Sequence, residues 1–117
     1  GDGSQTLDYI YVEEVARANV LAMLADSCDE YYNIGSGESS SLLDILQLLL
    51  RIQGSSLKPE FREARAIGNV TRRLADTRKA EKELGFKSQV SLEQGLRGLI
   101  AWRDQVKHRA VAQVTSD

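Results

Sequence analysis

Apolar residues recur at the three- and four-residue spacing of an amphipathic helix in four parts of the chain. These parts lie at about 12–25, 42–53, 77–84 and 92–108. The second is apolar around most of its circumference, so other structure must cover it on more than one side. Ser41 with Asp44, and Ser91 with Gln94, have the spacing of a capping box, which marks a helix start. Gly85 fits the left-handed position that ends the third helix.

Between the helices, the pattern favours short strands. Apolar and aromatic residues alternate with others over 6–12, which predicts a strand. Residues 31–34 predict a second strand and 58–62 a weaker third, while 68–73 reads as a loop or short extended stretch. The expected fold is therefore α/β, a small domain of about four helices and three short strands. Residues 1–108 are expected to form the domain, and 109–117 a disordered tail.

Composition narrows the class of protein. The 117 residues suit one domain, and 42% hydrophobic with 27% charged residues is typical of a globular chain. Fifteen basic against seventeen acidic residues argue against nucleic acid or an anionic membrane as a partner. No apolar run approaches the roughly 20 residues of a membrane span. The single cysteine, Cys28, rules out an internal disulfide, so we expect a cytoplasmic protein.

Candidate catalytic groups are few. His108 is the only histidine, which argues against a serine–histidine nucleophile and against a metal site built on cysteine and histidine. The paired carboxylates Glu13–Glu14 and Asp29–Glu30 fit helix-start and turn charges better than acid–base catalysis, which stays open. The Gly35-Ser-Gly37 turn has neither the third glycine of a dinucleotide site nor a Walker lysine, so it is a weak phosphate cradle.

Four arginines gather in a short stretch without helical periodicity, namely Arg62, Arg65, Arg72 and Arg73. An arginine cluster is most often a solvated face. The alternative is a clamp for a diphosphate, because the planar guanidinium binds phosphate oxygens in a bidentate manner. Both readings stay open from the residues alone.

Several stretches resemble one family, the NAD-dependent nucleotide-sugar epimerases and dehydratases of the extended short-chain dehydrogenase/reductase type, with UDP-glucose 4-epimerase as a typical member. The stretches follow the family's order and roughly its spacing. They are GDGSQTLDYIYVEEVARA (1–18), YNIGSGES (32–39), RRLADTRKA (72–80), ELGF (83–86) and SLEQGL (91–96). The resemblance covers only the C-terminal third of such an enzyme and implies the C-terminal portion of an extended Rossmann-type fold.

The resemblance also implies a role. This portion of the family helps to close the nucleotide-sugar site, which makes Asp8 and Tyr9, together with Arg65, Arg72 and Arg73, candidate substrate-binding residues. The family's NAD-binding glycine fingerprint is absent, and none of the four tyrosines is followed four residues later by the family's catalytic lysine. We therefore expect no cofactor and no catalytic residue in this chain, although NAD serves the parent family.

Two departures from the family pattern bear on binding. Leu7 stands where members usually carry an arginine that contacts the diphosphate, and the stretch from Arg65 to Asn69 is one residue longer than usual, with asparagine in place of aspartate. One hypothesis is a portion that binds a nucleotide diphosphate sugar beside a missing cofactor domain. The other is a non-catalytic remnant that acts as an oligomerisation or interaction module, for which a homo-oligomer is expected.

Overall fold

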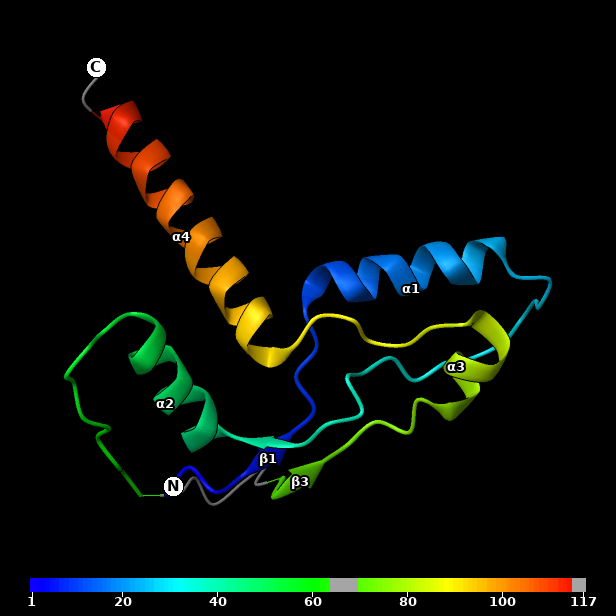
Figure 1. Cartoon of the computed structure of the whole chain (residues 1–117), viewed down its shortest axis with the longest axis horizontal. Coiled ribbons are helices and arrows are strands. Elements are labelled where there is room, and N and C mark those ends of the chain that lie inside the picture. Colours follow the sequence, from blue (N-terminus) through cyan, green and yellow to red (C-terminus); the bar gives the residue numbers. More distant parts are fainter. Residues whose placement is uncertain (64–69, 115–117) are drawn as a thin grey trace.

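The computed structural model describes residues 1–63 and 70–114, with side chains to residue 107. It has four helices in these residues, α1 (Val12–Leu24), α2 (Leu42–Ile52), α3 (Arg78–Leu84) and α4 (Leu92–Val114). Three two-residue strands, β1 (Thr6–Leu7), β2 (Ser40–Ser41) and β3 (Arg72–Arg73), form one sheet. The expected α/β class with four helices and three short strands is confirmed (Figure 1).

The helix ends follow the signals in the sequence. The Ser41 hydroxyl accepts from the Asp44 N–H at 3.0 Å, and the Asp44 carboxylate accepts from the Ser41 N–H at 2.9 Å, which completes the capping box of α2. The Ser91 N–H donates to the Gln94 side chain at 2.9 Å in the same arrangement. Gly85 ends α3 with φ of 65°, as expected. Helix α4 continues to Val114, beyond residue 108, where the domain was expected to end. The domain boundary itself stays a prediction.

The strands differ from expectation. The strand expected over 6–12 is reduced to β1, and neither 31–34 nor 58–62 forms a strand. Instead β1 lies in the middle of the sheet, antiparallel to β2 and parallel to β3. A strand requires a neighbouring strand for its backbone hydrogen bonds. Within the described residues, only the first two positions of the 6–12 segment have such a neighbour.

The buried core is small and lies between α1 and α3. Only Ala18, Ala80, Leu84 and Phe86 are buried apolar residues in the described part. The radius of gyration is 18.0 Å, against about 13 Å for a compact domain of this length. The accessible surface is 9423 Å². A folded monomer of this mass typically exposes about 6,300 Å², so the surplus is roughly 3,000 Å². The chain thus leaves much apolar surface uncovered.

The arrangement of the elements accounts for that surface. Figure 1 shows α1 and α3 on one side, the sheet and α2 on the other, and α4 projecting away from the rest. No residue of the strongly apolar helix α2 is buried. Trp102 of α4 is 59% exposed and Met23 of α1 is 80% exposed. The expectation that α2 lacks a covering surface agrees with its incomplete burial.

Candidate functional site

The parallel pairing of β1 with β3 brings the N-terminal stretch against the arginine pair. The Thr6 N–H donates to the Thr71 carbonyl at 3.0 Å, and the Asp8 N–H donates to the Arg73 carbonyl at 2.9 Å. Three of the five expected site residues, Asp8, Arg72 and Arg73, therefore gather at one part of the sheet. Both arginines are exposed.

The Asp8 carboxylate joins three segments of the backbone. It accepts hydrogen bonds from the Ser36 N–H at 2.7 Å, the Ser36 hydroxyl at 2.6 Å and the Gly37 N–H at 3.0 Å, with a longer one from the Ala75 N–H at 3.4 Å. A Cβ at Gly35 would lie 2.7 Å from the Ala75 Cβ, so this turn requires a glycine. Asp8 thus holds the Gly35–Gly37 turn against the end of β3, a structural task for the residue expected to bind substrate.

A groove of about 550 Å³ opens beside the starts of β1 and β3. It is lined by residues before β1 and beside β3, namely Gly1, Asp2, Ser4, Gln5, Phe61, Arg62, Glu63 and Thr71. Arg62 is paired with Glu60 at 3.0 Å, and hydrogen bonds from Ser4 hold the pKa of Asp2 below its ordinary value. The lining carries both charge signs, so by itself it does not strongly favour an anion.

None of the expected site residues that the structure describes, Asp8, Tyr9, Arg72 and Arg73, lines this groove. Arg65 lies outside the described residues, so its assignment stays a prediction. Tyr9 lines an apolar groove of about 420 Å³ with Tyr11 and Leu96, and a polar cavity of about 240 Å³ with Ser36 and Gln89. Its hydroxyl is buried without a hydrogen-bond partner in the described chain. Tyr9 is absent from the lining of the groove beside β1 and β3.

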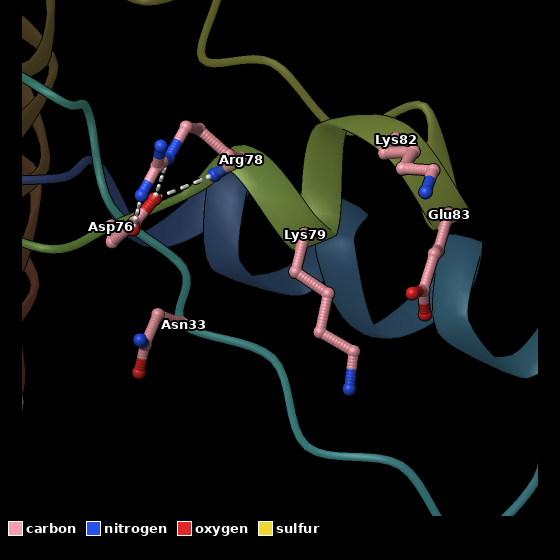
Figure 2. Close-up of a pocket in the computed structure, with 6 residues that line it drawn as sticks. All are labelled: Asn33, Asp76, Arg78, Lys79, Lys82 and Glu83. Atoms are coloured by element: carbon pink, nitrogen blue, oxygen red, sulfur yellow. Dashed lines mark hydrogen bonds and ion pairs between the residues drawn. The ribbon is translucent and has the colours of Figure 1, made fainter.

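A charged cavity of about 470 Å³ lies between α3 and the segment around Asn33 (Figure 2). The side chains of Asp76 and Arg78 face each other there and form an ion pair, which lowers the pKa of Asp76 to about 2. Lys79 donates to Glu30 at 2.6 Å, which raises the pKa of the lysine. Glu83 accepts from the Tyr32 hydroxyl at 2.9 Å. Because these charges are largely paired within the chain, the cavity offers little net attraction to a charged ligand.

Glu14 is the one buried charged residue among those described, and it is only 4% exposed. Its carboxylate accepts from the Gln89 N–H at 2.6 Å and from Arg17 at 3.1 Å. Burial alone would raise its pKa, but the hydrogen bonds from Gln89, Ser88 and Arg17 outweigh burial and lower it. The Arg17 guanidinium lies 4.8 Å from the centre of the Phe86 ring. Glu14 therefore has a structural role, which is to connect α1 to Gln89, a residue 75 positions further along the chain.

Two glycines of α4 form a slot that sequence reasoning missed. Tyr11 packs across Gly95 and Gly98, and a Cβ at Gly98 would lie 2.8 Å from the Tyr11 hydroxyl oxygen. The Gly-x-x-Gly spacing on one helix face was the available signal. Within residues 1–63 and 70–107, no group of three or more acidic, cysteine or histidine side chains could hold a metal. The described helices include none able to span a bilayer.

Known proteins share this arrangement. A family model described as GDP-mannose 4,6 dehydratase matches residues 1–99. The chain belongs to this family. Its structure is similar to that of the UDP-glucose 4-epimerase of Thermotoga maritima with UDP-glucose, with a TM-score of 0.84 and 36% identity, over 91% of this chain and 34% of that one. The resemblance to nucleotide-sugar epimerases and dehydratases is confirmed.

Two further epimerases are similar to this chain. The UDP-glucuronic acid 4-epimerase of Bacillus cereus, in complex with UDP-glucuronic acid and NAD, gives a TM-score of 0.83 at 33% identity, over 91% of this chain and 34% of that one. The UDP-glucose 4-epimerase of Mycolicibacterium smegmatis is 32% identical over 96 residues, which is 82% of this chain and 30% of the relative. The chain thus spans about a third of the length of the relatives it matches.

Proposed function

We propose that this chain is a nucleotide-sugar-binding portion of an epimerase or dehydratase, that it binds a UDP-sugar and that it is not catalytically competent alone. The substrate class follows the relatives, two of which are 4-epimerases crystallised with UDP-glucose or UDP-glucuronic acid. On this proposal a cofactor-binding part supplied from elsewhere completes the site, in the cytoplasm.

One observation carries the proposal. The groove beside β1 and β3 lies where the N-terminal stretch, the chain after α2 and the arginine-bearing strand meet. Among residues 1–63 and 70–107, neither Arg72 nor Arg73 forms an ion pair, whereas Arg17, Arg62 and Arg78 do. Unpaired guanidinium groups beside a groove are suited to phosphate oxygens, because they offer several N–H donors in a fixed plane.

The lack of catalysis rests on residues absent from the printed sequence. Hydride transfer in the family needs a bound dinucleotide, and the chain has no glycine fingerprint to hold a pyrophosphate at a helix start. It also has no tyrosine–lysine pair at the family's spacing. The proposed chain therefore binds a substrate that other residues transform.

A second candidate function is an oligomerisation module, favoured by the uncovered apolar surface. Val12 and Leu24 of α1 are 71% and 74% exposed, and Leu99 of α4 is 51% exposed. The surplus of roughly 3,000 Å² on one chain exceeds the about 800 Å² that each partner buries in an interface of standard size. In this case Leu7, which cannot pair with phosphate, reflects a lost ligand site, and the chain associates with copies of itself.

A nuclear magnetic resonance titration with UDP-glucose tests the first candidate. The ¹⁵N-labelled chain is expected to show saturable shifts at the backbone amides of Gln5, Arg62 and Thr71, which line the groove. Amides of Lys79 and Lys82, beside the charged cavity, serve as the internal control and should not move. Absence of saturable shifts at the groove, with self-association in sedimentation, would instead support the oligomerisation module.

A further inference from the structure

The outer part of α4 carries apolar side chains that no other described element covers. Every residue of 101–107 is exposed, and Figure 1 shows this part of the helix projecting away from the rest of the chain. Trp102 is 59% exposed and Val106 is 44% exposed. A helix in a protein gains most of its stability by packing an apolar face, so about two turns of helix exposed on all sides, with a tryptophan among them, indicate a partner.

These side chains continue an apolar face that begins at the base of α4. The members of this face recur at intervals of three or four residues, which places them on one side of the helix. Its first three members also line the apolar groove of about 420 Å³, opposite Ile45 and Leu49 of α2. The face, called the α4 stripe below, consists of Leu92, Leu96, Leu99, Trp102 and Val106.

The α4 stripe is self-complementary when two copies of α4 run antiparallel. Trp102 and Leu96 lie three positions on either side of Leu99. Val106 and Leu92 lie seven positions on either side of it. In an antiparallel pair with Leu99 at the twofold axis, Trp102 of one copy therefore meets Leu96 of the other, which lines the groove.

Charges on one flank of the stripe favour the antiparallel direction. Glu93 lies in the first turn of α4, whereas Arg103 and Lys107 lie in its exposed part. In the antiparallel pair, Glu93 of one copy stands level with the space between Arg103 and Lys107 of the other, whereas a parallel pair sets like charges side by side. Arg97 of the same chain binds Glu93 through Oε1, at 2.7 Å, and Oε2 faces the second copy.

We infer that two copies of this chain associate through antiparallel α4 helices, with Trp102 of each copy seated in the groove between α2 and α4 of the other. This inference rests on the second candidate function and names its surface. An interface of standard size takes about 800 Å² from each partner, which is about a quarter of the surplus surface of the chain.

Sedimentation of the wild-type chain and of the Trp102→Ala and Met23→Ala variants tests the surface. Both variants shorten an exposed apolar side chain, one on α4 and the other on α1. Tryptophans at the centre of an interface are commonly hot spots, so Trp102→Ala is expected to raise the dissociation constant of the dimer by about thirtyfold or more, and Met23→Ala by less than about threefold. A wild-type chain that is monomeric at tens of micromolar, or equal effects of the two variants, would overturn the inference.

Disulfide cross-linking tests the direction of the helices. Cys28 is exposed, so the variants are made in a Cys28→Ser background. Leu99→Cys places a thiol at the twofold axis and should cross-link two copies on mild oxidation, because a disulfide needs Cα atoms about 4.4–6.8 Å apart. Ala101→Cys, exposed on the opposite side of α4, is the matched control. Cross-linking that is no faster at position 99 than at position 101 would contradict the antiparallel pairing.

These results are separable from ligand binding, because the groove beside β1 and β3 shares no lining residue with the groove between α2 and α4. A dimer with the expected response to Trp102→Ala that gives no saturable UDP-glucose binding supports the inference and the second candidate function. A monomer that binds UDP-glucose overturns the inference and leaves the first candidate function standing.

Discussion

Replacing Glu14 with glutamine removes a charge from the most deeply buried polar site of the described chain. The carboxylate is 4% exposed and holds the 87–89 segment to α1 through the Gln89 N–H at 2.6 Å. Glutamine keeps one acceptor oxygen but turns an NH₂ group toward the other partner. Either the Gln89 N–H or the Arg17 guanidinium then faces a donor instead of an acceptor.

The expected cost follows from these contacts. A hydrogen bond to a charged group contributes about 1.5–3 kcal/mol, and glutamine keeps one of the two acceptor oxygens, so Glu14→Gln should lower the free energy of unfolding by about 2 kcal/mol. The side chain of Arg17 is 31% exposed, so water offsets part of its loss. Truncation to alanine removes both acceptor oxygens and should cost about 3 kcal/mol or more.

Urea denaturation followed by circular dichroism measures this change. With a slope of about 1–3 kcal/mol per molar, a loss of 2 kcal/mol shifts the midpoint by roughly 1 M. Glu13→Gln is the matched control, since Glu13 is adjacent on the same helix but exposed. Equal midpoints for the two variants would refute the reasoning.

The same carboxylate predicts a pH dependence. Because folding lowers the pKa of Glu14 from its ordinary 4.5, its stabilising contribution is fully present above about pH 4.5 and is lost as the pH falls through the lower folded-state pKa. The difference in unfolding free energy between wild type and Glu14→Gln should therefore be constant near neutral pH and should become smaller below about pH 4.5. A gap that widens on acidification would contradict this sign.

Further predictions concern packing, the turn, the ligand and association. Gly98→Ala places a Cβ 2.8 Å from the Tyr11 hydroxyl oxygen, so it should destabilise the chain by about 1–3 kcal/mol, and a Tyr11→Phe background should recover part of that loss in thermal melts. Asp8→Asn keeps one acceptor oxygen, so either the Ser36 N–H or the Gly37 N–H faces a donor, which should cost about 2 kcal/mol, read from the urea midpoint; an unchanged midpoint would contradict the structural role of the carboxylate. Leu7→Arg should tighten UDP binding about tenfold in a calorimetric titration, and an unchanged affinity would contradict the placement of Leu7 at the ligand site. Sedimentation should show a dimer or larger species at tens of micromolar, and a well-folded monomer there would count against uncovered apolar surface driving association.

Local signals predicted the helices and non-local contacts decided the rest. Ser41, Ser91 and Gly85 act within a few residues of their own position, so their roles can be read from spacing. A two-residue strand has no measurable alternation, and β3 exists only because a segment distant in sequence lies beside β1. Residues 31–34 have a strand-like composition, yet no described segment pairs with them.

The candidate site shows the same division. The arginine cluster and the Asp–Tyr pair after Leu7 could be identified from the sequence, but their orientation could not. Asp8 binds the backbone of Ser36, 28 positions away, and sheet register sends Arg72 and Arg73 to opposite faces. Both facts depend on tertiary contacts that no spacing rule contains.

Parallel calorimetric titrations of the purified chain with UDP-glucose and with NAD test the central claim most directly. The account predicts saturable one-to-one binding of UDP-glucose and no saturable heat with NAD. Arg72 and Arg73 form no ion pair with the described residues and lie near a groove, whereas the sequence has no dinucleotide fingerprint. Saturable binding of NAD, or no binding of UDP-glucose by a chain whose circular dichroism shows it folded, would contradict it.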